Sequence, residues 1–185
     1  MFSFWREADP AARRALWAAS LGWMLDAFDV WIYALVLTSV RADLSLSAAT
    51  AGGLQSLTLL ASAVGGLAFG VIADRYGRVR ALMASVLIYS VFTAACGFAQ
   101  NVLQLAVFRI ALGVGMGGEW ASGAALVAET WKPEHRNRAM AFMQSAWALG
   151  LGLAALVNYL VQDVFGGNWR TVFFVGIAPA LFAFW

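Results

Sequence analysis

The chain has 185 residues, of which 62% are hydrophobic and 12% charged, with a formal net charge of +2. Soluble globular domains are about half apolar and about a quarter charged, so this composition excludes them and indicates an integral membrane protein. A single cysteine, Cys96, excludes an internal disulfide. The sequence has no Cys/His metal cluster, phosphate-binding glycine loop or nucleophile elbow, so we expect no enzyme activity, metal, cofactor or nucleic-acid partner.

Six apolar runs qualify as membrane-spanning helices, since about 20 residues at roughly 1.5 Å each cross a hydrocarbon core of roughly 30 Å. They cover residues 16–40, 49–73, 81–99, 102–127, 139–161 and 171–185. The first run is too long for a cleaved signal peptide and has two acids in its middle. The connections are short, which predicts that neighbouring helices run antiparallel in the lipid bilayer.

The first span, residues 16–40, contains Asp26 and Asp29 in an otherwise apolar run. An ionised carboxylate in lipid costs at least about 2.5 kcal/mol, and two that lie close together also repel each other. We therefore expect both acids to face a cation or water, along a pathway through the membrane. Tyr33 lies one turn beyond Asp29 on the same face, where it lines a cavity or packs at a helix interface.

The second span, residues 49–73, leads into the segment Gly70-Val-Ile-Ala-Asp74-Arg75-Tyr-Gly77-Arg78-Val-Arg80. Its glycines allow a tight turn between neighbouring helices. Asp74 lies at a helix C-terminus, where the macrodipole repels a carboxylate, so we expect it to pair with Arg78 or with another helix N-terminus. The alternative is an ordinary basic loop that fixes topology. For Gln55 and Ser62, on one face of the span, cavity lining and hydrogen bonding between helices are both open.

The fourth span, residues 102–127, contains the segment Arg109-Ile-Ala-Leu-Gly113-Val-Gly115-Met-Gly117-Gly118-Glu119-Trp120. Glycines at this density thin one helix face, so a neighbouring backbone packs closely against it or slides along it. Packing does not require ions in lipid, so Arg109 and Glu119 indicate a function.

The fifth span, residues 139–161, carries Gln144 and Asn158 on nearly the same face. Cavity lining and hydrogen bonding between helices are again both open for them. The single histidine, His135, lies in a basic loop, and we expect it to be a solvated surface residue that carries no proton for transport.

Basic residues lie mostly on one side of the predicted membrane. Nine of the twelve precede the first span or lie in the connections after the second and fourth spans. Two lie on the other side, and Arg109 lies within a span. The nine are Arg6, Arg13, Arg14, Arg75, Arg78, Arg80, Lys132, Arg136 and Arg138, and the two are Arg41 and Arg170. The positive-inside rule then places the N-terminus in the cytoplasm, and six spans return the C-terminus there. We expect a multi-pass protein of the cytoplasmic (inner) membrane.

Ionisable residues within the spans occur in the first and fourth, and these are equivalent members if the six spans form two sets of three. We therefore predict an all-α membrane protein whose six transmembrane helices form two inverted three-helix repeats. In that arrangement, residues 16–40 and 102–127 both line a central cavity.

Two of these segments resemble the major facilitator superfamily. The loop matches its G-x-x-x-D-R-x-G-R-x-R/K pattern at Gly70, Asp74, Arg75, Gly77, Arg78 and Arg80, and the fourth span matches R-x-x-x-G-x-G-x-G at Arg109, Gly113, Gly115 and Gly117. Four further segments are similar to proton-coupled organic-acid carriers, especially the sialate and aromatic-acid symporter groups. They are Leu25–Asp29, Gly117–Trp120, Glu129–Trp131 with Arg136–Ala139, and Asn168–Phe174.

The resemblance implies a longer protein and a direction of coupling. Members of the superfamily have twelve helices, so residues 1–185 are expected to form the N-terminal six-helix bundle, as a natural half or a fragment, with a C-terminal half as its partner. Antiporter branches have a Gly-Pro-rich motif in helix five, and the run 140–161 has no proline. This implies symport or uniport. The loop motif, together with Glu129, Arg136 and Arg138, is expected to act in a cytoplasmic gate.

Depth along the helices suggests how the buried charges divide their roles. At about 1.5 Å per residue, Asp29 lies level with Arg109, and Asp26 lies near Glu119 in the middle of the membrane. An acid beside another acid in poor solvent holds a proton more readily than one beside an arginine. The acids Asp26, Asp29 and Glu119 are therefore the proton-coupling candidates, with Asp26 and Glu119 the better site.

Arg109 is predicted to neutralise an anionic substrate, and the other substrate-binding candidates are Tyr33, Gln55, Gln144 and Asn158. We thus predict the N-terminal half of a secondary active transporter for proton-coupled uptake of a small organic acid by alternating access. The alternatives are a carrier for another solute, such as a sugar or drug, and a non-transporting binding or assembly module. The identity of the substrate is not readable from the sequence.

Overall fold

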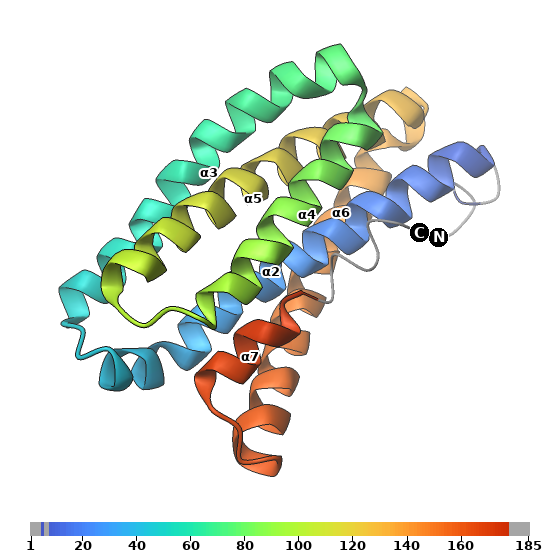
Figure 1. The fold of residues 1–185 in the computed structure, drawn as a ribbon. Helices are drawn as coiled ribbons and strands as arrows, with labels where there is room; N and C mark the ends of the chain where they lie inside the picture. The colour runs from blue at the N-terminus through green and yellow to red at the C-terminus, as the bar shows by residue number, and fades with distance from the viewer. Residues whose placement is uncertain (1–4, 6–7, 178–185) are drawn as a thin grey trace.

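The computed structural model describes residue 5 and residues 8–177. The elements in chain order are α2 (Pro10–Asp43), α3 (Ala48–Tyr76), α4 (Arg78–Cys96), α5 (Val102–Thr130), α6 (Pro133–Tyr159), the π-helical turn η1 (Leu160–Val164) and α7 (Trp169–Val175) (Figure 1). The last eight residues of the expected sixth span, 178–185, lie outside the described residues, as does Arg6 of the expected basic side.

Local sequence signals set where the helices begin. Three helices begin at a residue whose side chain accepts a hydrogen bond from a backbone N–H of the first helical turn. These capping residues are Ser47 for α3, Asn101 for α5 and Asn168 for α7. Such capping satisfies a donor that the helix leaves without a partner. Gly77 alone connects α3 to α4 with a φ of 95°, a conformation that favours glycine. The tight turn expected from the glycines of this loop is therefore confirmed.

Five described helices are long and apolar enough to cross a membrane: α2, α3, α4, α5 and the continuous run Pro133–Val164. They contain the first five predicted spans, with one difference at the end of α4. That helix ends at Cys96, where the predicted span continues to residue 99, because the chain turns at Gly97 and Phe98 with short backbone bonds back to Ala94 and Ala95. The transmembrane all-α fold class is confirmed.

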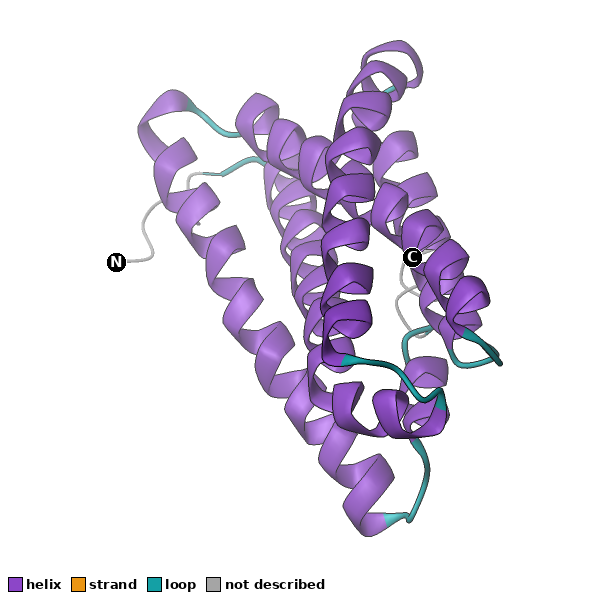
Figure 2. Ribbon diagram, turned by 90° about the vertical axis from the view of Figure 1, so that its left-hand side faces the viewer, coloured by secondary structure: helices purple, strands orange, loops and turns teal. Residues whose placement is uncertain are grey.

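The helices form two sets of three in chain order, α2 to α4 and α5 to α7, and the main contacts are between helices of different sets. α5 lies along α3 and α4, α2 lies along α6 and against α7, and α2 and α5 meet in the centre (Figures 1 and 2). The first helix of each set therefore packs on the second and third helices of the other set. This pairing is what two inverted three-helix repeats predict, and it puts the two charge-bearing helices at the middle of the bundle.

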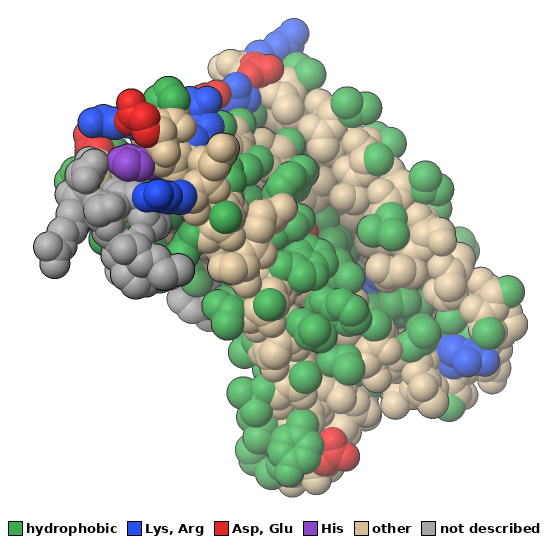
Figure 3. Space-filling view, turned by 180° about the vertical axis from the view of Figure 1, so that it is seen from behind, with side chains coloured by type: hydrophobic (Ala, Val, Ile, Leu, Met, Phe, Trp, Pro, Cys, Tyr) green, Lys and Arg blue, Asp and Glu red, His purple; other side chains and the backbone are tan. Residues whose placement is uncertain are grey.

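The surface divides into apolar flanks and a charged end. Large hydrophobic side chains such as Leu60, Val64 and Leu67 are exposed along α3. Charged side chains gather at one end of the face shown in Figure 3, around the single histidine. We call this the basic end, defined by Arg13, Arg14, Arg75, Arg78, Arg80, Lys132, Arg136 and Arg138; Arg41 and Arg170 mark the opposite end. The apolar flanks suit a lipid environment, since soluble monomeric proteins rarely expose large contiguous apolar patches.

Candidate functional site: a cavity backed by buried charges

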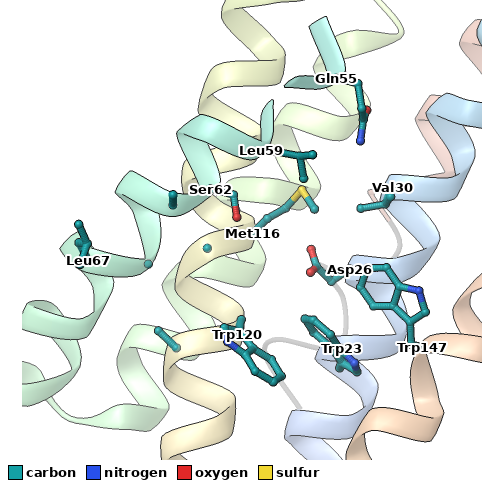
Figure 4. Close-up of a pocket in the computed structure, with 14 residues that line it drawn as sticks. Trp23, Asp26, Val30, Gln55, Leu59, Ser62, Leu67, Met116, Trp120 and Trp147 are labelled. Carbon is teal, nitrogen blue, oxygen red and sulfur yellow. The ribbon is translucent and has the colours of Figure 1, made fainter. Parts of the chain in front are cut away.

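A cavity of about 670 Å³ lies between α2, α3, α5 and α6 (Figure 4). The residues that line it are Trp23, Asp26, Val30, Gln55, Leu59, Ser62, Ala63, Gly66, Leu67, Met116, Gly117, Trp120, Ala121 and Trp147. Its walls are mostly apolar, with a few polar groups, as in many small-molecule sites. The sequence-based expectation that the first and fourth spans line a central cavity agrees with this geometry.

Asp26 is the charged residue among those that line the cavity, and its carboxylate projects from α2 toward the space beside Met116 (Figure 4). Three tryptophans surround its end of the cavity. The Trp23 ring centre lies 4.6 Å from that of Trp120 and 4.7 Å from that of Trp147. These rings bring α2, α5 and α6 together and give the cavity flat apolar faces next to an acid.

Glu119 lies behind Asp26 and is completely buried, at 0% exposure. Its Oε1 atom packs against Gly22 of α2, where a Cβ atom would lie only 2.5 Å away. Gly22 is one turn from Asp26, and the two carboxyl groups are within electrostatic range of each other. Neither Glu119 oxygen has a hydrogen-bond partner among the described residues. The predicted proximity of Asp26 and Glu119 is therefore present, and glycine at position 22 makes the space for it.

Asp29 is also buried, but its hydrogen-bonded partner is not Arg109, the residue that depth along the helices places at its level. Its Oδ2 atom accepts a hydrogen bond of 2.7 Å from the Thr93 hydroxyl of α4. Asp29 lies within electrostatic range of Arg109, yet no ion pair joins these two side chains in the described part of the chain. Depth alone placed the two residues at the same level. The rotation of each helix about its axis turns Asp29 toward α4 and Arg109 toward α3.

Arg109 is 1% exposed and is held by residues of α2 and α3. Its Nε atom donates to the Thr58 hydroxyl at 3.0 Å, and its Nη2 atom donates to Gln55 Oε1 at 2.6 Å. The guanidinium carbon lies 3.7 Å from the centre of the Tyr33 ring, a cation–π contact. Its Nη1 atom has no partner among the described residues. Gln55 lines the cavity and Arg109 does not, so Gln55 stands between the arginine and the cavity.

The remaining predicted substrate-binding residues are distributed unevenly. Tyr33 is buried, with its ring against Arg109 and its hydroxyl donating 3.0 Å to the Ala51 carbonyl. Gln144 is exposed on α6 and Asn158 accepts a hydrogen bond from Gln162, and neither lines the cavity. Asn158 thus bonds within its own helical run, which is neither the cavity lining nor the hydrogen bonding between helices that the sequence left open. Gln55 and Ser62 do line the cavity.

The glycines of α5 bring two helix backbones very close to it. A Cβ atom at Gly113 or Gly117 would collide with the backbone carbonyl of Thr58 or Ser62 on α3. A Cβ atom at Gly115 would lie 2.7 Å from the Tyr89 backbone nitrogen on α4. The close-packing interpretation of these glycines is therefore confirmed, and it explains why α5 packs on α3 and α4 at once.

At the basic end, Arg78 connects three helices. Its Nη2 atom lies 2.7 Å from Asp74 of α3 and 3.0 Å from Glu129 at the end of α5. The expectation that Asp74 needs an arginine partner is confirmed. The other charged members of the predicted gate, Arg75, Arg80, Arg136 and Arg138, lie at the same end and are exposed or half-buried, and Gly70 faces open space.

Sequence reasoning missed several residues of the site. Thr58, Thr93, Tyr89 and the tryptophans at 23 and 147 were not singled out, since hydroxyl and aromatic residues are common in any membrane helix. One signal was available: Thr58 is three residues after Gln55 and Thr93 is four after Tyr89, which puts each pair on one helix face. Nothing in the sequence said that those faces turn toward the buried charges.

Comparisons with known proteins support this fold. Residues 19–185 match the Major Facilitator Superfamily. A probable 4-methylmuconolactone transporter of Cupriavidus pinatubonensis is 38% identical over 183 residues, which cover 98% of this chain and 43% of that protein. The niacin transporter NiaP of Acinetobacter baylyi is 38% identical over 169 residues, 91% of this chain and 38% of that protein. The sialic acid transporter NanX of Escherichia coli is 34% identical over 183 residues, 99% of this chain and 45% of that protein.

Among solved structures, the xylose transporter XylE from E. coli, in a partially occluded inward open conformation, superposes with a TM-score of 0.83 at 19% identity, over 94% of this chain and 48% of that one. That identity supports the fold alone. The chain spans about two fifths of the length of the curated relatives described above. Its sequence match, its helix packing and its motif residues together establish that the chain belongs to the major facilitator superfamily.

Proposed function

We propose that this bundle is one six-helix half of a carrier that takes up a small organic acid together with a proton. The single observation that carries the proposal is the order of groups at the cavity. Asp26 stands at the cavity wall beside three tryptophans, and the buried cation Arg109 lies one residue behind the wall, reached through Gln55. The cavity wall supplies this acid, amide and hydroxyl groups, and aromatic faces, which suit the binding of a small molecule.

The substrate class follows from Arg109 and from the relatives. A guanidinium presents several N–H donors in a fork that matches a carboxylate. A substrate carboxylate that displaced Gln55 from Nη2 would also reach the unpartnered Nη1 atom. The Trp23, Trp120 and Trp147 rings offer flat faces to a ring or conjugated chain. The names of the relatives, which specify carriers of muconolactone, niacin and sialic acid, are consistent with an organic acid.

The proton site is proposed to be the pair Asp26 and Glu119. Two carboxyl groups this close, one of them without any exposed surface, are most stable when they share a single negative charge. Because Asp26 faces the cavity, a proton on this pair is available from the solution that the cavity faces. Loss of that proton would leave two adjacent buried negative charges, which favours a change of state that rehydrates them.

The basic end is proposed to face the cytoplasm, in the inner membrane, because eight described cations gather there against two at the opposite end. In this orientation, Arg78 with Asp74 and Glu129 lies at the cytoplasmic gate. A membrane-impermeant thiol reagent tests the orientation. Lys132→Cys should react only from the cytoplasmic side and Phe165→Cys only from the other, with buried Cys96 giving little background. Labelling of both variants from one side would contradict it.

A second six-helix half is proposed to close the exposed side of the cavity by alternating access. Leu59, Leu67 and Trp120 line the cavity and are nevertheless 55%, 78% and 39% exposed. The cavity also contains the polar side chains of Asp26, Gln55 and Ser62, which lipid cannot satisfy, so its exposed side is expected to face another protein surface. The relatives, which are more than twice the length of this chain, have the residues to supply such a surface.

The proposed function is tested in vesicles that contain the full-length carrier. An inward proton gradient should drive accumulation of a radiolabelled organic acid, and a protonophore should abolish it. Asp26→Asn and Glu119→Gln should abolish accumulation but keep exchange of internal for external substrate, because exchange moves no net proton. Asp163→Asn, a matched change at an exposed acid of η1, should behave as the wild type. Intact proton-driven accumulation in both buried variants would contradict the coupling assignment.

The substrate class is tested separately by competition. We expect niacin, benzoate, muconate or sialate, in excess, to compete with the labelled acid, and xylose or a cationic drug not to compete. Competition by a sugar without any competition by acids would favour the alternative carrier class.

A further inference from the structure

We infer that the Tyr89 hydroxyl passes the proton between Asp29 and the pair Asp26 and Glu119, so that α4 takes part in coupling. This inference rests on the proposed function, because it requires that the buried acids carry a proton. It concerns a residue that has no charge, on a helix whose membrane-spanning part, residues 81–96, has no charged residue at all. The observations that carry it are the register of α2 against α4, the burial of Tyr89 and the packing of Gly115.

The register puts Tyr89 level with Asp26. α2 and α4 run in the same direction, and the 2.7 Å hydrogen bond from Thr93 to Asp29 fixes their relative height. Three residues back along α2 is Asp26, and four residues back along α4 is Tyr89. Both steps move about 5 Å toward the basic end and return to nearly the same helix face. Glu119 lies one further turn along, against Gly22.

The Tyr89 hydroxyl lies within electrostatic range of three acids and is hydrogen-bonded to none of them. The side chain is 0% exposed, and its hydroxyl has no hydrogen-bond partner among the described residues. The charged or titratable groups that act on it electrostatically are Asp29 and Asp26 on α2 and Glu119 on α5. A buried hydroxyl without a partner costs free energy, about 1–3 kcal/mol in typical proteins, so its retention among three acids indicates that it makes its bond in another protonation state.

Gly115 keeps the Tyr89 ring at this place. A Cβ atom at position 115 would lie 2.7 Å from the Tyr89 backbone nitrogen and 3.0 Å from its Cβ atom. The glycine therefore lets α4 approach α5 closely enough for the phenol to reach the level of the acids. This gives Gly115 a role that differs from the roles of Gly113 and Gly117, which bring α5 close to α3.

The proposed step is balanced without any other reactant. When Asp29 is protonated, its O–H bond breaks and the proton moves to the phenol oxygen, while the phenol's own O–H bond breaks and that proton moves to the carboxylate of Asp26 or Glu119. Asp29 becomes an anion, the receiving acid becomes neutral, and Tyr89 is a neutral phenol before and after. A phenol is suited to this because its oxygen both donates and accepts a hydrogen bond.

The test is Tyr89→Phe in the full-length carrier in vesicles, with Tyr159→Phe, at a half-exposed tyrosine of α6, as its matched control. Substrate exchange at equal pH should stay within about twofold of the wild type, since the ring still fills the same space. Proton-driven accumulation should fall at least about tenfold, a threshold set below the roughly 10²–10⁴-fold that a proton-transfer group typically contributes. The control should match the wild type in both assays. A Tyr89→Phe variant that accumulates substrate like the wild type, or that loses exchange to the same degree as accumulation, overturns the inference.

A second substitution keeps the test independent of folding. A 3-fluorotyrosine at position 89 retains the ring and the hydroxyl but makes the phenol more acidic. We expect it to change the rate of proton-driven uptake and to leave exchange unaltered; equal rates to the wild type in both assays overturn the relay.

Failure of the proposed function is distinguishable from failure of the relay, because the wild type itself would then show no proton-driven accumulation. If the wild type accumulates substrate and Asp26→Asn does not, a coupled Tyr89→Phe variant refutes only the relay.

Discussion

The charges inside the bundle and the charges at its two ends are satisfied in opposite ways. At the ends, Arg78 pairs with Asp74 and Glu129, and Arg170 pairs with Asp43. Inside, the described residues give Glu119 no hydrogen bond at all and leave one oxygen of Asp26 and one nitrogen of Arg109 without a partner. Exposed pairs are inexpensive to keep, whereas a buried unpaired ion is costly. The difference supports our proposal that the interior charges change partners during transport.

The ion pairs Arg78–Glu129 and Arg170–Asp43, which we call the terminal clamps, are placed as the internal repeat predicts. Arg78 in the first turn of α4 reaches Glu129 in the last turn of α5. Arg170 in the first turn of α7 reaches Asp43 at the end of α2. In each case the third helix of one set holds the first helix of the other, at opposite ends of the bundle. An arginine at a helix N-terminus and an acid at a C-terminus each oppose the helix dipole, so the pairing offsets both unfavourable placements.

The largest expected effect comes from removing the interior cation. Arg109→Ala should lower the free energy of unfolding by about 3–6 kcal/mol, because it removes two hydrogen bonds from a charged donor, each worth about 1.5–3 kcal/mol, and takes away a cation that lies within electrostatic range of buried Asp29. Substrate affinity should fall with it. Adding Asp29→Asn should restore protein yield but not transport, which separates the structural role from the binding role. Thermal unfolding in detergent and substrate binding are the measurements, and full transport by Arg109→Ala would contradict the assignment.

A smaller but still large effect is expected where α5 meets α3. Gly117→Ala places a Cβ atom against the Ser62 carbonyl and the Gly66 nitrogen, and over-packing of this kind costs about 1–3 kcal/mol. Gly70→Ala, whose Cβ atom would meet nothing within 4 Å, is the matched control and should not lower the unfolding temperature. Equal behaviour of the two variants would show that the close approach of α3 and α5 is absent.

The sequence predicts the helix spans and the ends of the bundle better than it predicts the contacts of the buried charges. The spans, the tight turn at Gly77, the Asp74–Arg78 pair and the closeness of Asp26 to Glu119 follow from hydropathy, glycine chemistry and depth. The partners of Asp29 and Arg109 do not, because helix depth carries no information on rotation about the helix axis. Likewise, the sequence shows that α5 has a thin face at Gly113–Gly117, but only packing shows that Gly115 faces Tyr89 and its neighbours face α3.

The aromatic wall of the cavity should matter for affinity more than for stability. Trp120→Ala removes a ring that lies against Trp23 and lines the cavity, so the space it leaves opens into the existing cavity and forms no new closed void. Loss of one stacking face, about 0.5–1.5 kcal/mol, should weaken binding of a planar acid by roughly two- to tenfold. Trp120→Phe, which retains a smaller aromatic face, should recover part of the lost affinity. A shift in unfolding temperature as large as that of Arg109→Ala would mean that this ring is structural.

The smallest effect is expected at the terminal clamps, and it tests the comparison directly. Arg78→Ala and Arg170→Ala should each lower the free energy of unfolding by no more than about 1 kcal/mol, because exposed ion pairs are screened by solvent and salt. The loss should shrink further at high salt, whereas the loss from Arg109→Ala should not, since salt does not reach a side chain that is 1% exposed. Arg14→Ala, at an exposed arginine of α2, is the control for removing a cation from the surface. Unfolding curves of the four variants at low and high salt decide the matter: a salt-independent loss at Arg78 or Arg170 would show that the clamp is as much a part of the interior as Arg109.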